Sequence, residues 1–266
     1  MLRRLAPVTV AAVTATLLLA GCSGAHPHHA RAGHTPTPTP TVHVGGALGQ
    51  RPTASPSPSA DATAPSIPPI AASATVATAE VASVAVHAAA AGAVTTTLPN
   101  PQSNGAPLVF LVVAQQSGWV EVDVPTRPNG RTGWVRASDV ALSTVAYHLV
   151  AVTETNTLTV YRAGRPVATY PVASGTGGTP TPHGSFYLTE LLKPTNAGYG
   201  PYAYGLSAFS DVLTSFGGGP GQIGLHGTDD ASSIGKDASH GCIRMQNADI
   251  TALTKLLPLG TPITII

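Results

Sequence analysis

The chain contains no Phe, Tyr or Trp before Phe110, although it is 266 residues long. Between Cys22 and Pro101 it carries 12 of its 25 prolines and only four charged residues. The Thr-Pro repeats in this part favour an extended, polyproline-like backbone. Such a segment buries too little apolar surface to offset the entropy lost on ordering it. We therefore expect residues 22–101 to be a disordered linker rich in Pro, Ala and Thr, weakly helical at 71–94.

The N-terminus has the pattern of an export signal. Arg3 and Arg4 precede an uncharged apolar run that is short for a membrane span, so we expect a signal peptide over residues 1–21. The run ends in Leu-Ala-Gly-Cys22, which resembles the lipobox of bacterial lipoproteins, in which the cysteine receives lipid. The resemblance implies an exported protein, anchored by lipid at the outer face of the cytoplasmic membrane or in the cell wall. An ordinary cleaved signal is the alternative.

The chain has two cysteines, Cys22 and Cys242. Exported proteins commonly pair their cysteines, so an unpaired Cys242 in an oxidising compartment indicates a thiol kept for chemistry. A Cys22–Cys242 disulfide is the alternative, but it would join a low-complexity tail to the folded part and constrain nothing folded.

Strand patterns begin after the linker. Apolar, β-favouring residues run over 107–113, and strict alternation follows over 118–124. These patterns predict a small β module over residues 102–144. Its Gly-Trp-Val patterns at Trp119 and Trp134 resemble the small SH3-like barrels of bacterial envelope proteins.

A second, mostly β domain is predicted over residues 145–266. Glycines and prolines separate several strand-like segments, and only 247–257 has the apolar spacing of a helix, with Asn247 as its expected N-cap. The strand-like segments are 148–152, 158–161, 167–172, 184–188 and 262–266. About 120 residues of this kind are enough for one domain with its own core.

Charge and ligand spacing argue against nucleic-acid binding and against a zinc site. The formal net charge is +1 and charged residues make up 9% of the chain, with no basic patch, so no nucleic-acid partner is expected. A zinc ion bound by Cys242, His240 and His226 would lack a usual fourth protein ligand and a paired spacing. We therefore expect no metal and no cofactor.

The run Ser239-His240-Gly241-Cys242 places a thiol beside an imidazole. A thiol with a pKa near 8.5 is only a few per cent ionised at neutral pH, so an acyl-transfer enzyme must supply a base. His226 and His240 are both candidates, and the residues alone leave the choice open. Gly241 permits a tight turn and close approach of a substrate to backbone N–H groups, as an oxyanion site needs.

The spacing of these residues resembles a family signature. His226-Gly-Thr, twelve residues, and then Ser239-His-Gly-Cys242-Ile-Arg-Met are similar to the L,D-transpeptidase catalytic domain of bacterial cell walls. The resemblance implies that Cys242 is the nucleophile and His226 its general base, held by a backbone carbonyl near Gly227. It implies a β-sandwich with one short helix after the catalytic cysteine.

The same resemblance assigns roles to the remaining motif residues. His240 and the N–H groups around Gly241 and Cys242 would line the oxyanion site. Ser239 would support His240 at the substrate site, and Arg244 would hold the loop or a substrate carboxylate. A surface ion pair of Arg244 with Asp237 or Asp249 is the alternative.

The family's reaction implies the partner. Cys242 would form a thioester with a peptidoglycan tetrapeptide stem, release D-alanine, and pass the acyl group to an amine of a neighbouring stem, which joins two third residues. Carbapenems acylate the nucleophile in this family. A wall-peptide hydrolase or carboxypeptidase, and a non-catalytic wall-binding lipoprotein, are the alternatives.

The aromatic-rich segment 193–216 is either a lid over the donor peptide or a loop that packs its own side chains.

Overall fold

The computed structural model describes residues 66–216 and 219–266, which belong to one compact unit, Ala60–Ile266. The expected signal peptide and Cys22 lie outside the described residues, so their predictions stay predictions. Within the described ranges, no helix is long and apolar enough to cross a membrane.

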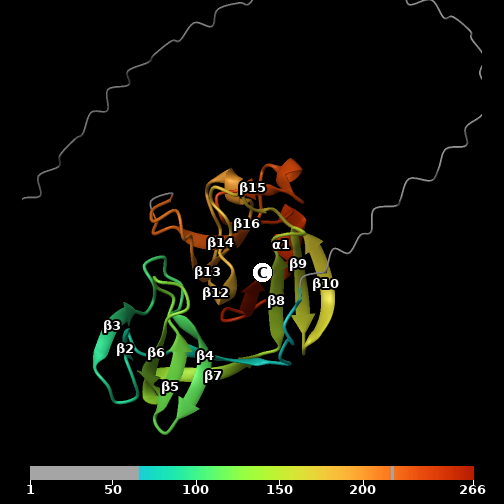
Figure 1. The fold of residues 1–266 in the computed structure, drawn as a ribbon. Coiled ribbons are helices and arrows are strands. Elements are labelled where there is room, and N and C mark those ends of the chain that lie inside the picture. The colour runs from blue at the N-terminus through green and yellow to red at the C-terminus, as the bar shows by residue number, and fades with distance from the viewer. Residues whose placement is uncertain (1–65, 217–218) are drawn as a thin grey trace, which may run out of the picture. The chain divides into compact units, whose positions relative to one another are not determined.

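Seven antiparallel strands form the first sheet, in the order β3-β2-β6-β5-β4-β1-β7 (Figure 1). Its strands are β1 (Ala74–Ala79), β2 (Ser83–His87), β3 (Val94–Pro99), β4 (Val109–Gln116), β5 (Trp119–Asp123), β6 (Thr132–Arg136) and β7 (Val140–Val145). The core of this sheet is mostly valine, alanine and leucine around Phe110, which is fully buried.

The prediction of a disordered linker up to residue 101 is wrong for its last part, because β1, β2 and β3 fall within it. These strands carry alternating Val, Ala and Thr, which are small or β-branched residues that suit a pleated, half-buried surface. The expected weak helix at 71–94 is likewise wrong. β1 pairs with both β4 and β7, so the module begins well before residue 102. The SH3-like resemblance stays a prediction.

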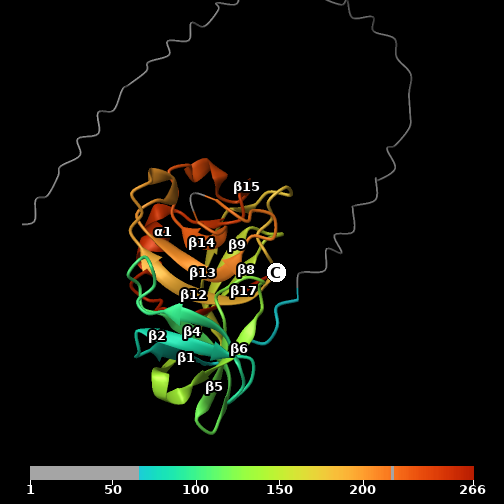
Figure 2. The ribbon, with the colours of Figure 1, turned by 90° about the vertical axis from the view of Figure 1, so that its left-hand side faces the viewer.

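The second sheet has eight strands, in the order β10-β9-β8-β17-β12-β13-β14-β16 (Figure 2). Its strands are β8 (Tyr147–Val152), β9 (Thr157–Arg162), β10 (Arg165–Pro171), β12 (Gly184–Leu192), β13 (Ala203–Phe209), β14 (Gln222–His226), β16 (Ile243–Arg244) and β17 (Pro262–Ile265). Two short strands, β11 (Ser174–Gly175) and β15 (Asp237–Ser239), pair separately. The predicted mostly β fold is confirmed.

A single α-helix, α1 (Asn247–Leu253), lies among the described elements and follows Cys242, as expected. Ile250 and Leu253 are its buried residues and join the core of the second sheet. The prediction that Asn247 caps this helix is wrong, because Gln246 occupies the N-cap. The Asn247 side chain instead accepts a hydrogen bond from the Thr228 N–H at 2.9 Å.

Two parts of the first sheet contact the second, namely the strands β4 and β5 and the loop between β5 and β6. The fully buried Tyr187 of β12 donates from its hydroxyl to the carbonyls of Val109 and Asp123, at 3.2 and 3.1 Å. Arg127 donates to the carbonyls of Ser210, Leu213 and Pro220 at 2.9, 3.0 and 2.9 Å. Arg127 therefore holds the segment between β13 and β14 at three points.

Removal of residues 66–101 tests the revised boundary. We expect a chain that begins at residue 66 to unfold in one cooperative thermal transition. A chain that begins at residue 102 will lose ordered structure in the first sheet, because β4 and β7 lose β1 and Phe110 loses its cover. Circular dichroism and thermal melting compare the two, and equal melting temperatures and equal β content per residue would contradict the assignment.

Candidate functional site

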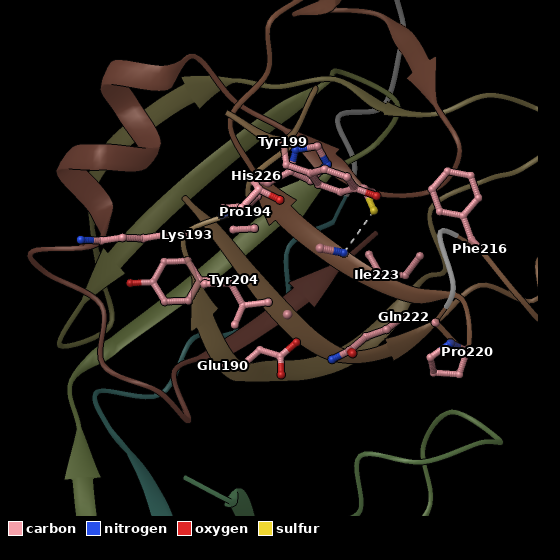
Figure 3. Close-up of a pocket in the computed structure, with 17 residues that line it drawn as sticks. Glu190, Lys193, Pro194, Tyr199, Tyr204, Phe216, Pro220, Gln222, Ile223 and His226 are labelled. Atoms are coloured by element: carbon pink, nitrogen blue, oxygen red, sulfur yellow. Dashed lines mark hydrogen bonds between the residues drawn. The ribbon is translucent and has the colours of Figure 1, made fainter. Parts of the chain in front are cut away.

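The site is built where β14 meets β16. These strands pair in parallel, with Leu225 opposite Ile243 and His226 opposite Arg244. Cys242 directly precedes β16, and its Sγ accepts a hydrogen bond from the Gly224 N–H at 3.3 Å (Figure 3). A Cβ placed on Gly224 would lie 3.8 Å from the Cys242 Sγ and 3.5 Å from the His226 Cδ2. The thiol and the imidazole therefore flank the same glycine, 16 residues apart in sequence.

The hydrogen bond of His226 determines its tautomer. Its Nδ1 lies 2.5 Å from the carbonyl oxygen of Gly227, which can only accept, so Nδ1 carries the proton and Nε2 keeps a lone pair. The ring is 3% exposed and lies against Tyr199, with centroids 4.7 Å apart. Burial lowers the pKa of His226 to about 4; the Gly227 carbonyl partly offsets this shift, and Arg244 adds to it. His226 is therefore a neutral base at physiological pH.

The thiol of Cys242 is protonated in the free protein. Burial raises its pKa, while the Gly224 N–H and the charge of Arg244 act in the opposite direction. A thiol with a raised pKa beside an imidazole with a lowered pKa is a neutral pair. A neutral thiol needs a base to take its proton before it can act as a nucleophile, and His226 is the neutral base near it.

Ser239 closes the turn that presents the thiol. It is 2% exposed, and its hydroxyl donates to the Cys242 carbonyl at 2.6 Å and accepts from the Gly241 N–H at 3.0 Å. Ser239 therefore has a role in the turn, and it also borders a cavity beside His240, so its expected role at the substrate stays a prediction. Gly241 has a φ of 116°, which favours glycine at this position.

This turn also corrects the expected oxyanion donors. The Gly241 N–H is already bound to Ser239, so it is not available to a substrate oxygen. Of the two N–H groups expected around Gly241 and Cys242, that of Cys242 remains a candidate donor.

Neither His240 nor Arg244 takes part in the hydrogen bond that holds the His226 ring. His240 is exposed and its ring stacks on Phe216, with centroids 5.4 Å apart and planes at 28°. Arg244 is half-buried and borders the same small cavity as His240. Asp237, one alternative partner of Arg244, instead accepts hydrogen bonds from Asn156 and Ser174 at 2.9 and 3.0 Å.

Two cavities open on the thiol. The larger, of about 560 Å³, is lined by Cys242, His226 and Tyr199 together with residues of β12, β13 and the segment before β14 (Figure 3). The smaller, of about 270 Å³, is lined by the same three residues and by residues that include His240 and Arg244. A molecule in either cavity would therefore reach the same sulfur atom.

Sequence reasoning missed several lining residues. Tyr199 and Phe216 lie in the segment left open between lid and self-packed loop, and they contact His226 and His240 respectively. Tyr204 of the same segment is fully buried and donates to the Leu257 carbonyl at 2.9 Å. Part of the segment therefore borders the cavities and part belongs to the core, while its role as a lid stays a prediction. Glu190 was also missed, because nothing in its local sequence marks it.

Metal binding finds no support in the side chains that the structure places. Among residues 66–216 and 219–266, no group of three or more His, Cys, Asp or Glu side chains is arranged to hold a metal ion.

The turn role of Ser239 predicts the effect of Ser239→Ala. Loss of the hydroxyl leaves the Gly241 N–H buried without a partner, so we expect the free energy of unfolding to fall by about 1–3 kcal/mol. Chemical denaturation measures this change. The control is Ser232→Ala, whose hydroxyl bonds only in an exposed turn. Equal effects of the two substitutions would contradict the role of Ser239.

The neutral pair predicts how alkylation of Cys242 depends on pH. Because its pKa is raised, the thiolate fraction grows about tenfold per pH unit between pH 6 and 8, and the iodoacetamide rate should follow it. Mass mapping of the alkylated peptide separates Cys242 from Cys22, and the unfolded protein is the control. A rate that is already constant from pH 5 upward would indicate a preformed thiolate–imidazolium pair instead.

Known proteins match the second sheet and its site. The family model for YkuD, the L,D-transpeptidase catalytic domain, matches residues 146–265. A protein named YkuD from Bacillus subtilis strain 168 is 36% identical over 122 residues, which cover 46% of this chain and 67% of that protein. A YkuD protein from Bacillus licheniformis is 38% identical, with the same coverage.

Solved structures give more distant matches. An L,D-transpeptidase from Enterococcus faecium is 21% identical with a TM-score of 0.37, over 45% of this chain and 49% of that one. L,D-transpeptidase 3 from Mycobacterium tuberculosis is 17% identical with a TM-score of 0.39, over 51% and 74%. The motif around Cys242, the family match and the identity to the Bacillus proteins agree, and the chain therefore belongs to the YkuD family of L,D-transpeptidase catalytic domains.

Proposed function

We propose that the protein is a peptidoglycan L,D-transpeptidase. Cys242 forms a thioester with a tetrapeptide stem and transfers the acyl group to an amine of a neighbouring stem, which gives a cross-link between third residues. The observation that carries this proposal is the thiol of Cys242 near the neutral His226, with two cavities that both border the pair. A transfer between two substrates needs access for both, and the two cavities offer it.

Acylation begins with the donor stem in one cavity. The Cys242 Sγ attacks the carbonyl carbon before the terminal D-alanine as His226 Nε2 takes the thiol proton. The C–N bond then breaks, and the imidazolium returns the proton to the departing amine of D-alanine. The Gly227 carbonyl keeps Nδ1 protonated throughout, so that Nε2 is the atom that gains and loses the proton. The products are D-alanine and the thioester.

Transfer repeats these steps with an amine in place of the thiol. The acceptor amine attacks the thioester carbonyl, His226 takes a proton from that amine, and the C–S bond breaks. The proton then returns to the sulfur and restores the neutral pair. The thiol and the base supply this chemistry without a metal or cofactor.

Two further groups act on the reacting peptide. The Cys242 N–H is the proposed donor to the oxyanion, with His240 beside it. Arg244, at the smaller cavity, is the proposed partner of a substrate carboxylate, where a guanidinium binds through two parallel hydrogen bonds.

Location follows from the substrate. Peptidoglycan stems lie outside the cytoplasmic membrane, so we propose that the signal peptide exports the protein and that a lipid on Cys22 anchors it. Residues between Cys22 and β1 would then span the distance from the membrane to the wall.

The experiment that tests the function uses the full-length chain, a tetrapeptide stem as donor and an amine-bearing stem as acceptor. We expect wild-type protein to release D-alanine and form a cross-linked product. Cys242→Ala should lose both activities, and His226→Gln should lower the rate at least 100-fold, since a positioned general base contributes that much. Liquid chromatography with mass spectrometry measures D-alanine and the product.

The matched control is His183→Gln, an exposed histidine outside both cavities, which should leave the rate unchanged. If D-alanine is released but the only other product is the hydrolysed tripeptide, even at high acceptor concentration, the protein is a carboxypeptidase and the proposed transferase activity is wrong. A folded protein that releases no D-alanine and forms no carbapenem adduct on Cys242 would contradict any enzymatic function and favour a wall-binding lipoprotein.

A further inference from the structure

A single row of residues across the second sheet joins Glu190 to Cys242. Glu190 of β12 pairs with Gly205 of β13, and Gly205 pairs with Gly224 of β14. Gly224 in turn donates its N–H to the sulfur of Cys242. Neighbouring strands lie about 4.8 Å apart, so the backbone positions of Gly205 and Cys242 are roughly 10 Å apart across the floor of the larger cavity.

The two glycines keep this floor open. A Cβ on Gly205 would lie only 2.4 Å from the Glu190 Oε1 and 2.8 Å from the Gln222 Nε2. The Glu190 carboxylate therefore lies over Gly205, in the space that any other residue would fill. At Gly224 the missing side chain leaves the gap between thiol and imidazole. The row is a trough with the nucleophile near one end and a carboxylate at the other.

Glu190 lacks a cationic partner among the described residues. Its side chain is 7% exposed, and its Oε2 accepts a hydrogen bond from Asn104, whereas Oε1 faces the trough. The neighbouring amide of Gln222 is already committed to Thr189 and the Leu206 carbonyl. Burial raises the pKa of Glu190 and the Asn104 bond lowers it, with no contribution from a basic side chain.

The nearest lysine of the cavity does not fill this role. The Lys193 ammonium lies over the Tyr202 ring, 5.7 Å from its centre, and Figure 3 shows it directed away from Glu190. A buried carboxylate that borders a cavity without a counter-ion is unfavourable until a cation or a hydrogen-bond donor reaches it. A cation on a molecule that enters the cavity would supply such a partner, because Glu190 lines it.

We infer that the Glu190 Oε1 binds a free ammonium group of the donor peptide, and so selects donors whose acylating residue carries an amine-bearing side chain. This inference rests on the proposed function, because it places the donor in the larger cavity with its reacting carbonyl at Cys242. A lysine-like side chain that runs from this carbonyl along the two glycines points its ammonium toward Glu190. Glu190 is thus a specificity-determining residue, and it takes no part in bond making.

A structural role for Glu190 makes a different prediction. Asn104 and Gln102, which donates to the Thr189 carbonyl at 3.1 Å, belong to the loop before β4, so Glu190 could serve only to anchor this loop. An anchor affects every donor alike, whereas an ammonium site affects only donors that carry the charge. The ratio of kcat/KM between a charged and an uncharged donor therefore distinguishes the two roles.

The test measures D-alanine release by the full-length protein from two donors that end in X-D-alanine. In one donor X is lysine, and in the other X is Nε-acetyllysine, which has nearly the same length without the charge. We expect wild-type protein to have at least tenfold higher kcat/KM for the lysine donor, as expected for a buried charged hydrogen bond. Glu190→Gln should bring this ratio close to one, mainly through loss on the lysine donor.

Three controls make the result decisive. Glu154→Gln, at an exposed glutamate in the turn after β8, should keep the wild-type ratio. Thermal melting of Glu190→Gln shows whether the fold is retained, and the glutamine can still accept the Asn104 bond. Asn104→Ala should lower kcat/KM for both donors but keep the preference for the lysine donor, since it leaves the Glu190 carboxylate in place.

The outcomes are distinct. A wild-type ratio near one, or a Glu190→Gln ratio equal to that of wild type, would overturn the ammonium site while leaving the proposed function intact. Failure of wild-type protein to release D-alanine from either donor would overturn the proposed function and this inference with it. A kcat/KM ratio that falls close to one in Glu190→Gln, but not in Glu154→Gln or Asn104→Ala, supports the ammonium site at Glu190.

Discussion

The site depends on the parallel pairing of β14 with β16. This register sets His226 opposite Arg244 and places Cys242 beside Gly224, whose N–H contacts the sulfur. Directly after β16, the Met245 N–H donates a hydrogen bond to the His226 carbonyl of β14 at 2.8 Å. A register slip of one residue would turn the imidazole to the other face of the sheet. The chemistry therefore rests on strand pairing more than on any contact between the two side chains.

Burial decides the ground state of the reacting pair. His226 is buried and Cys242 is half-buried, which disfavours both charged forms, and the nearby Arg244 further disfavours the imidazolium. The N–H of Gly224 and the carbonyl of Gly227 are fixed dipoles that favour the charged forms during the reaction. The same low polarity makes the Glu190 carboxylate, at the far end of the trough, a favourable place for a cation.

The sequence predicted the mostly β fold and which residues of the motif lie together, but it missed the first three strands of the first sheet. Cys242, His226 and the Gly227 carbonyl follow from a local motif, and the structure brings them together. β1 to β3 were missed because their Val, Ala and Thr residues lack the aromatic anchors that mark a core, which β4 supplies through Phe110. Glu190 could not be predicted, since it reaches the site only through pairings between strands distant in sequence, and Tyr199 reaches His226 from the turn Ala197–Tyr199. The turn role of Ser239 was missed because turn geometry is invisible in a one-dimensional motif.

The central claim is that the thiol of Cys242 itself carries the acyl group between the two stems. Rapid-quench mass spectrometry of the full-length protein, mixed with a tetrapeptide donor and no acceptor, tests it most directly. We expect a transient adduct on the Cys242 peptide, with the mass of the donor less D-alanine, which disappears when an acceptor amine is added. D-alanine released at the same rate without any adduct on Cys242, or with the adduct on another residue, would contradict it.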